Sequence, residues 1–212
     1  MKQNDYTELY FVRHAESDIS VKDERTRPLT AKGHRDAQQL CRVFTDITID
    51  HIYSSPYVRT VDTLKYLAES RNKQIVQCSD LRERAIGRWV DDFFPYAQKQ
   101  WNDFQYALEH GESLQDVQER NMMVVNTLLT QHERETVLIG THGTALGTIC
   151  NYYEPQFGFE YFRAMVETMP YIIKMLFEKH TLKSIREVPL NGAAPSSFWY
   201  KTQAGAQSRP TV

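Results

Sequence analysis

Residue types that bind phosphate follow three short hydrophobic runs of this chain. The set comprises two histidines, two arginines and a glycine: Arg13, His14, Arg59, His142 and Gly143. Guanidinium groups bind phosphate oxygens in bidentate pairs, and a backbone N–H at the start of a helix adds an oriented donor. A neutral imidazole can also attack phosphorus as a nucleophile and so divide one transfer into two easier steps. These residue types therefore favour phosphoryl-transfer chemistry.

His14 is the candidate nucleophile of this set. Positive neighbours disfavour the imidazolium ion, so Arg13 and Arg59 would keep the ring neutral. The departing group also needs a proton donor, and Glu83 stands in a suitable place after the third, weakly hydrophobic run. A lone histidine or arginine at a strand end usually caps the strand or faces solvent, so the prediction requires that these residues meet at one place.

The remaining histidines are expected to be structural or solvated. They are His34, His51, His110, His132 and His180. No two histidines lie two, three or four residues apart, and no cysteine cluster accompanies them, so we expect no metal site and no other cofactor. The glycine-rich phosphate loops of nucleotide-binding proteins and the Gly-x-Ser-x-Gly elbow are also missing from the sequence.

The composition predicts one soluble globular domain. The chain has 212 residues, with 25 Lys+Arg against 27 Asp+Glu and a net charge of −2. This near-neutral balance argues against a nucleic-acid-binding or polybasic membrane-surface protein. No apolar segment approaches the roughly 20 residues that span a bilayer, and the polar N-terminus does not resemble a secretory signal. Three cysteines without a Cys-x-x-Cys pair indicate buried thiols in a reducing compartment, so we expect a cytoplasmic location.

Four hydrophobic runs predict strands that are buried on both faces. They cover residues 9–12, 51–54, 75–76 and 137–140. Helical periodicity between and after them predicts helices after Thr30, after Ser55-Pro56, over 93–108, after Ser113 and over 145–153. This alternation is typical of an α/β layered fold, in which ligands bind beyond the carboxyl ends of the strands. The candidate residues all stand at that edge.

Local signals define several of these boundaries. Thr30 is a predicted N-cap, and Ser55 followed by Pro56 predicts an N-cap with proline at the first helical position. Ser113 with Asp116 resembles a capping box. Two further strands or a hairpin are predicted over 171–177 and 182–188, and the composition of 191–212 predicts a poorly ordered tail.

Six segments, in order along the chain, resemble the signatures of the histidine phosphatase superfamily, the phosphoglycerate-mutase-like proteins. They are Arg13-His14-Ala15, the stretch 28–33, the stretch 54–59, Leu81-Arg82-Glu83 with Gly87-Arg88-Trp89, Gly111-Glu112-Ser113 and Thr141-His142-Gly143. The resemblance covers roughly residues 9–150. It implies a three-layer αβα sandwich over 1–190, with a mostly parallel central sheet and a small helical lid insertion at about 89–112.

The resemblance also implies a metal-independent mechanism through phosphohistidine. In this mechanism His14 is the nucleophile, and Glu83 is the general acid and then the general base. The residues that would bind the substrate's phosphoryl group are Arg13, Arg59, His142, Gly143 and Ser20. Ser20 stands where many members of the family have an asparagine after a tryptophan, and here Ile19 replaces that tryptophan.

We therefore expect a phosphomonoesterase that hydrolyses a small phosphorylated metabolite, with the 89–112 segment helping to select it. The stretch 82–89 resembles phosphatases of the family more than mutases. Three alternatives stay open: a phosphoglycerate mutase, a phosphohistidine-protein phosphatase and a non-catalytic phosphate-binding domain. The sequence leaves the oligomeric state and the physiological substrate undecided.

Overall fold

One six-stranded sheet forms the centre of the molecule. The computed structural model describes residues 5–190, so the tail predicted over 191–212 lies outside the described part. The strand order is β3-β2-β4-β1-β5-β6. The strands are β1 (Thr7–Arg13), β2 (His51–Ser54), β3 (Ile75–Gln77), β4 (Thr136–Thr141), β5 (Tyr171–Glu178) and β6 (Thr181–Glu187). The four runs and the predicted hairpin are therefore all strands.

The sheet is mostly parallel, as predicted. Strands β1, β4, β2 and β3 run in the same direction, while β5 is antiparallel to β1 and β6 is antiparallel to β5. In the β1–β4 register, Glu8 lies opposite Thr136 and Arg13 lies opposite Thr141. The two strands thus end together, and the residues that follow them emerge side by side.

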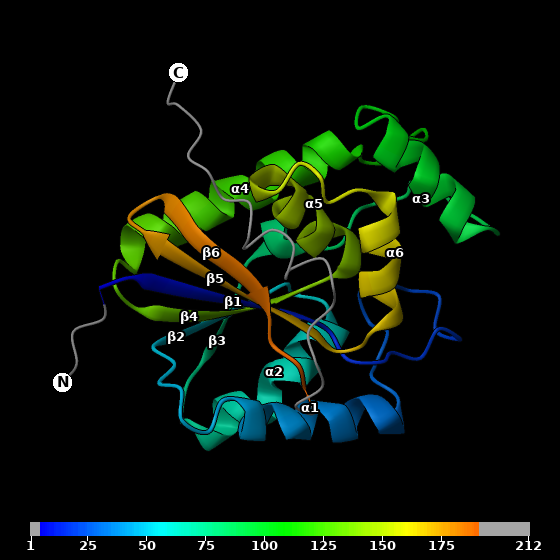
Figure 1. The fold of residues 1–212 in the computed structure, drawn as a ribbon. Helices are drawn as coiled ribbons and strands as arrows, with labels where there is room; N and C mark the ends of the chain where they lie inside the picture. The colour runs from blue at the N-terminus through cyan, green and yellow to red at the C-terminus, as the bar shows by residue number, and fades with distance from the viewer. Residues whose placement is uncertain (1–4, 191–212) are drawn as a thin grey trace.

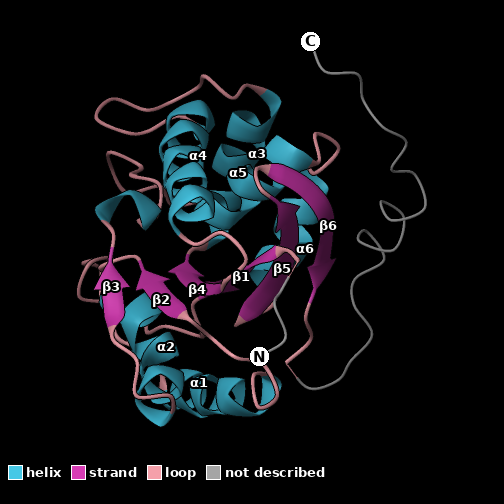
Figure 2. Cartoon of the chain, turned by 90° about the vertical axis from the view of Figure 1, so that its left-hand side faces the viewer, coloured by secondary structure: helices cyan, strands magenta, loops and turns pink. Residues whose placement is uncertain are grey.

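Helices cover both faces of this sheet, which gives three layers (Figure 1; Figure 2). One face carries α1 (Ala31–Val43) and α2 (Val58–Ser70). The other face carries α3 (Phe93–Asn102), α4 (Leu114–Gln131), α5 (Gly143–Tyr153) and α6 (Phe159–Glu167). The predicted αβα sandwich is confirmed. Within residues 5–190, no helix combines the length and the apolar character that crossing a membrane requires.

Alternating side chains of β1 divide the interior into two cores. Leu9 and Phe11 pack in the larger core beneath α4, α5 and α6, whereas Tyr10 and Val12 pack in the smaller core beneath α1 and α2. All four side chains are at most 2% exposed. Burial on both faces explains why the run has no alternation of apolar and polar residues.

Two predicted helix starts agree with the structure, and a third does not. The Thr30 side chain accepts a hydrogen bond from the Gly33 N–H, and Ser113 with Asp116 forms a complete capping box. Helix α2, however, begins at Val58 and has Tyr57 as its N-cap, so Ser55 and Pro56 precede the helix. The Ser55 hydroxyl bonds His142 instead, and this contact between distant parts of the chain overrides the local signal.

Helix α3 is shorter than the periodicity predicts, and α6 was not predicted. The pattern over 93–108 continues past Asn102, where α3 ends, because Phe104 still packs against Trp101 with ring centroids 5.5 Å apart. The ring of Trp101 also contacts Phe162 of α6. The aromatic stripe of α3 thus serves packing at this position. Phe94, on the same helix, is 38% exposed.

The three cysteines are free thiols. Cys150 is fully buried in the larger core, and burial raises the pKa of its thiol. Cys41 and Cys78 are only partly buried. The prediction of buried thiols thus describes Cys150 fully and the other two in part.

Candidate active site

His14 and His142 meet at the carboxyl edge of the sheet. Each follows the last residue of its strand, and the His14 N–H donates to the Thr141 carbonyl at 3.1 Å. Their ring centroids lie 5.4 Å apart with an interplanar angle of 66°. The parallel pairing of β1 with β4 is what brings together two residues so far apart in the sequence.

The His14 ring is held in one tautomer. Its Nδ1 lies 2.8 Å from the Ala15 carbonyl oxygen, which can only accept, so Nδ1 carries the proton and Nε2 keeps a lone pair. The side chain is 7% exposed. Burial and the charges of Arg59 and Arg13 hold the pKa of His14 well below its usual value. These effects favour the neutral ring at physiological pH, in which Nε2 carries an unshared lone pair.

His142 is oriented by Ser55, from the neighbouring strand end. The Ser55 hydroxyl lies 2.8 Å from His142 Nε2 and accepts from the Tyr57 N–H at 3.3 Å, so its own proton is free to donate to Nε2. When the hydroxyl donates in this way, the imidazole proton is on Nδ1, which has no hydrogen-bond partner among the described residues. Burial, Arg59 and His14 lower the pKa of His142 well below its usual value. The ring thus offers a neutral N–H donor.

Arg13 links the end of β1 to the end of α6. Its Nη1 donates to the carbonyl oxygens of Val166 at 2.8 Å and Thr168 at 3.0 Å, which are acceptors left free at the C-terminus of the helix. Burial lowers the pKa of Arg13 to about 10, so it stays a cation at neutral pH. Its Nε is buried and has no protein partner among residues 5–190.

Arg59 reaches the same region from the first turn of α2. Its Nη1 donates to the Glu24 carbonyl, and its Nη2 lies 3.9 Å from the Glu24 carboxylate. The Arg59 carbonyl accepts from Thr63, whose hydroxyl oxygen in turn accepts from the Ala15 N–H at 2.9 Å. Burial lowers the pKa of Arg59 and raises that of Glu24. These bonds tie the loop after His14 to helix α2.

The Glu83 carboxylate lies at the N-terminus of α5. It accepts from the N–H of Thr144 at 3.1 Å and of Ala145 at 3.3 Å. Helix N-termini attract anions because their first N–H groups lack partners within the helix. Glu83 is thus fixed beside His142, the N-cap residue of that helix.

Arg120 of α4 supports the backbone that carries Glu83. Its Nη1 donates to the carbonyl oxygens of Asp80 at 2.7 Å and Arg82 at 2.9 Å, and its Nη2 donates to that of Glu83 at 3.3 Å. Glu112 accepts from Arg120 Nε at 2.8 Å and lies in a salt bridge with Arg82. One cation of α4 therefore holds three carbonyl groups within the segment 80–83.

Of the two remaining predicted binding residues, Gly143 lies against Arg13, whereas Ser20 lies on the surface. A Cβ on Gly143 would lie 3.0 Å from Val166 Cγ1 and 3.3 Å from Arg13 Nε, so this position permits the close approach of Arg13. Ser20 is exposed, and its hydroxyl donates to the Asp18 carboxylate at 2.7 Å. The contacts of the described residues do not connect Ser20 with His14.

The segment after Glu83 packs around Arg84. This buried guanidinium donates to Gln100 Oε1 and lies over the rings of Phe93 and Tyr96, with its Cζ 5.5 Å and 4.9 Å from the two centroids. Farther along, the exposed Trp89 ring lies under the ammonium of Lys22, at 4.2 Å from the centroid. The predicted lid segment is thus anchored through Arg84 and touches the loop that follows His14.

Sequence reasoning missed the supporting residues of this site. Ser55, Glu24 and Arg120 each act through a partner distant in the chain. Ser55 belongs to the 54–59 stretch of the family resemblance, so that motif contained a signal for it. Arg120 lies in a helix with ordinary amphipathic spacing, and nothing local distinguishes it from a surface arginine.

Comparison with known proteins agrees with this arrangement. The model of the histidine phosphatase superfamily (branch 1) matches residues 9–182. A relative named probable phosphoglycerate mutase GpmB, from Proteus mirabilis, is 28% identical over 155 residues, which cover 67% of this chain and 72% of the relative.

Solved structures agree as well. YhfR of Bacillus stearothermophilus superposes with a TM-score of 0.71 at 27% identity, over 89% of this chain and 98% of that one. A phosphoserine phosphatase mutant of Entamoeba histolytica, in complex with phosphoserine, has the same fold, with a TM-score of 0.70 at 19% identity over 87% and 98% of the two chains. By the family model, which matches most of its length, this chain belongs to the histidine phosphatase superfamily, branch 1.

Proposed function

We propose that this protein is a phosphomonoesterase that hydrolyses a small phosphorylated metabolite through a phosphohistidine at His14. The observation that carries the proposal is the environment of the His14 ring. Its Nδ1 proton is bound by the Ala15 carbonyl, its ring centroid lies 5.4 Å from that of His142, and the charges of Arg59 and Arg13 act on it. A buried, neutral imidazole beside two cations suits attack on a phosphate ester.

Unsatisfied donors support the binding of an anion here. Arg13 Nε, Arg59 Nε and His142 Nδ1 are buried and, among the described residues, without a hydrogen-bond partner. A buried donor that lacks a partner is costly, and a phosphoryl group offers several acceptor oxygens. Donors already placed before the substrate arrives stabilise the charge that develops on those oxygens in the transition state.

The proposed reaction has two chemical steps, transfer of the phosphoryl group to His14 and hydrolysis of the phosphohistidine. His14 Nε2 forms a bond to phosphorus while the bond from phosphorus to the leaving oxygen breaks, and the Glu83 carboxyl group gives its proton to that oxygen. The Glu83 carboxylate then takes a proton from water. The resulting hydroxide oxygen bonds phosphorus, the N–P bond breaks, and His14 is again neutral. No metal takes part in this proposed sequence.

The test is hydrolysis of an aryl phosphate, with chelator present, by the wild-type protein and by His14→Ala. We expect at least a thousandfold loss of kcat in His14→Ala and no change in the matched control His180→Ala, whose side chain lies at the exposed β5–β6 turn. Quenching in alkaline denaturant should preserve a phosphoprotein in the wild type alone, and acid should then release its phosphate. A wild-type protein that is inert across a range of pH would contradict the proposal and favour a non-catalytic binding domain.

Phosphoglycerate mutase is the second candidate, because relatives of this chain are named probable phosphoglycerate mutases. The two activities differ in whether water reaches the phosphohistidine. Comparing the rate of phosphate release with the rate of transfer between 2- and 3-phosphoglycerate separates them. Faster transfer than hydrolysis would replace the phosphatase proposal with the mutase.

The 89–112 segment is proposed to act as a lid that selects the substrate. Its exposed Trp89 contacts Lys22 of the loop after His14, so the two segments meet beside the catalytic edge. Trp89→Ala should change the rank order of kcat/KM across a panel of phosphate esters, whereas Tyr152→Ala, which removes an exposed aromatic ring of α5, should preserve it. An unchanged order in Trp89→Ala would exclude this role of Trp89.

A further inference from the structure

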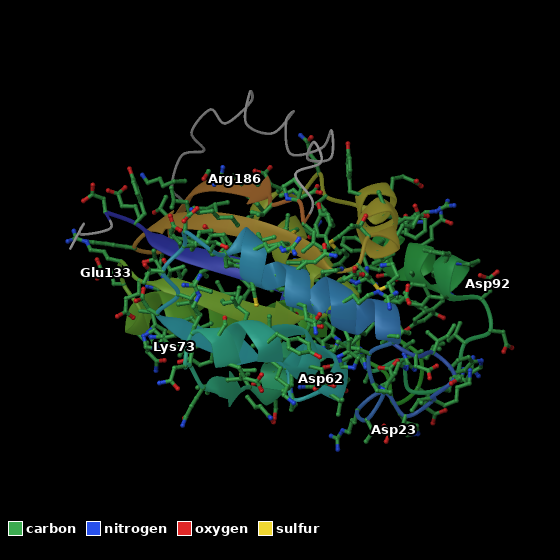
Figure 3. The ribbon with its side chains drawn as sticks, turned by 90° about the horizontal axis from the view of Figure 1, so that it is seen from below. Asp23, Asp62, Lys73, Asp92, Glu133 and Arg186 are labelled. Atoms are coloured by element: carbon green, nitrogen blue, oxygen red, sulfur yellow. The ribbon has the colours of Figure 1, made fainter. Side chains whose placement is uncertain are left out.

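A second group of imidazole and carboxylate side chains lies at the opposite edge of the sheet. His51 is the first residue of β2, His132 is the C-cap residue of α4, and Glu135 immediately precedes β4. One potential ligand atom from each residue lies within 4.8 Å of the other two. Figure 3 labels Glu133, a neighbour of His132, at the end of the molecule opposite Asp23 and Asp92 of the loops near the catalytic edge.

The three side chains converge on one carboxylate oxygen. Glu135 Oε2 lies 3.0 Å from His51 Nε2 and 2.9 Å from His132 Nδ1. The two imidazole rings form a tilted stack, with centroids 3.9 Å apart and an interplanar angle of 31°. Ligands of a tetrahedral Zn²⁺ bind at about 2.0–2.2 Å and so lie roughly 3.3 Å from one another. Two of the three distances between ligand atoms are thus close to this value, and the third, between the two nitrogens, is at most 4.8 Å.

The backbone around this cluster is fixed by the fold. The Glu135 N–H donates to the His132 carbonyl at 3.1 Å, and the Glu135 carbonyl accepts from the Glu8 N–H at 3.0 Å. His51 pairs with Val137 in the β2–β4 register. The ligand atoms are thus carried by strand ends and a tight turn, so little conformational freedom would be lost on binding.

Tyr53 forms a hydrogen bond with the second ring nitrogen of His132, as a neighbouring group usually does for a metal-binding histidine. Its hydroxyl lies 2.9 Å from His132 Nε2. When His132 Nδ1 binds a cation, the neutral ring carries its proton on Nε2, and the Tyr53 oxygen can accept it. The same hydroxyl can donate to Nε2 when Nδ1 holds the proton, so Tyr53 serves both forms of the ring.

The cluster is also accessible to ions and water. The side chains of His51 and Glu135 are 40% and 41% exposed, while that of His132 is 10% exposed. Two ligands therefore face solvent above one buried ligand, and water can complete the coordination. Two imidazole nitrogens with one carboxylate oxygen suit zinc and similar d-block ions better than Mg²⁺ or Ca²⁺, which prefer oxygen ligands.

We propose that His51, His132 and Glu135 bind one divalent cation of the zinc class. This cation would join the α4–β4 turn to the start of β2 at the edge far from His14, and so stabilise the folded protein without taking part in catalysis. The criterion of histidine spacing does not detect such a site, because its ligands come from two separate segments that only the β2–β4 pairing brings together.

The test begins with metal-depleted protein titrated with Zn²⁺ by calorimetry at neutral pH. We expect one equivalent to bind and to raise the thermal midpoint, and Co²⁺ bound in its place to give the visible spectrum of a low-coordinate site. His51→Ala and the nearly isosteric Glu135→Gln should each weaken Zn²⁺ binding at least about a hundredfold. Tyr53→Phe, which removes the outer hydroxyl, should weaken it roughly 10- to 100-fold.

Two control variants identify the place of binding. His180→Ala removes an exposed histidine elsewhere and should leave the Zn²⁺ titration unchanged. His14→Ala disrupts the other place where two imidazole rings meet and should also leave it unchanged. The proposal is overturned if wild-type protein binds no Zn²⁺, if binding survives in His51→Ala and Glu135→Gln, or if His14→Ala alone abolishes it. Unchanged aryl phosphate hydrolysis by Glu135→Gln would separate this site from the catalytic one.

Discussion

Glu83 and His142 are held by the same end of one helix. His142 is the N-cap residue of α5, and the Glu83 carboxylate accepts hydrogen bonds from Thr144 and Ala145 in the first turn. The proposed proton donor and the proposed phosphoryl-binding imidazole therefore keep a constant relation to each other. The two residues are far apart in the sequence, and both contact the N-terminus of α5.

This relation predicts that loss of Glu83 depends on the leaving group. Glu83→Gln should lower kcat/KM for alkyl phosphates by on the order of 10²–10⁴, because the alkoxide cannot leave without a proton. For 4-nitrophenyl phosphate the loss should be small, since nitrophenolate leaves unprotonated. A series of phosphate esters of graded leaving-group basicity measures the effect, and Glu69→Gln on the exposed side of α2 is the control. Equal losses across the series would show that Glu83 is no proton donor.

Arg120 is predicted to be a positioning residue for Glu83, because it donates to the Glu83 carbonyl and to two preceding carbonyl groups. Arg120→Lys keeps the charge but cannot make all of these bonds. We expect kcat/KM for alkyl phosphates to fall about tenfold or more, with a steeper dependence on leaving-group basicity. If Arg120 had a purely structural role, its loss would lower kcat/KM for all substrates by the same factor. An equal loss for 4-nitrophenyl phosphate would therefore reject this prediction.

Stability is predicted to fall as the pH drops below about 6.5, the value at which unfolded histidines titrate. Burial and neighbouring arginines lower the pKa of His14 and His142, so below that pH the unfolded chain binds protons that the folded chain does not. The contribution of the two neutral rings to the free energy of unfolding is fully present above about pH 6.5. It is lost on acidification at up to about 1.4 kcal/mol per pH unit for each ring.

The measurement is urea unfolding of wild type and His14→Asn at about pH 7 and about pH 5. His14→Asn removes one of the two rings and should therefore show a smaller loss of unfolding free energy over this interval. His180→Ala should behave like the wild type. Identical pH dependence in wild type and His14→Asn would mean that the ring charges in the folded state after all.

Gly143 is predicted to have little room for a side chain, because a Cβ there would lie 3.0 Å from Val166 Cγ1 and 3.3 Å from Arg13 Nε. Gly143→Ala should destabilise the fold by about 1–3 kcal/mol and lower kcat more than tenfold, since Arg13 must shift. Gly158→Ala is the matched control, because its Cβ would meet only the Gln156 carbonyl at 4.0 Å. Unfolding and steady-state kinetics test both variants, and wild-type kinetics for Gly143→Ala would contradict the prediction.

Elements with strong local patterns were predictable from the sequence. The continuous hydrophobic runs at 9–12 and 137–140 are strands, and the signals at Thr30 and Ser113 are true helix caps. Helix α6 was not predictable, since its N-cap Gly158 makes no side-chain bond and its C-terminal carbonyl groups bind Arg13. Its C-terminus is satisfied by a residue that is distant in sequence, and no side chain caps its N-terminus, so no local pattern marks either end.

The sequence by itself determined the layered fold, the family and the identity of the residues that could perform phosphoryl transfer. Hydrophobic periodicity, capping residues and short motifs depend only on residues close together in the sequence, so the sequence alone is enough to detect them. Only the tertiary structure decided that Ser55 orients His142 and that His51 lies against His132 and Glu135. Those contacts depend on which strands pair and in what register, and that pairing results from the packing of the whole sheet between its two helical layers.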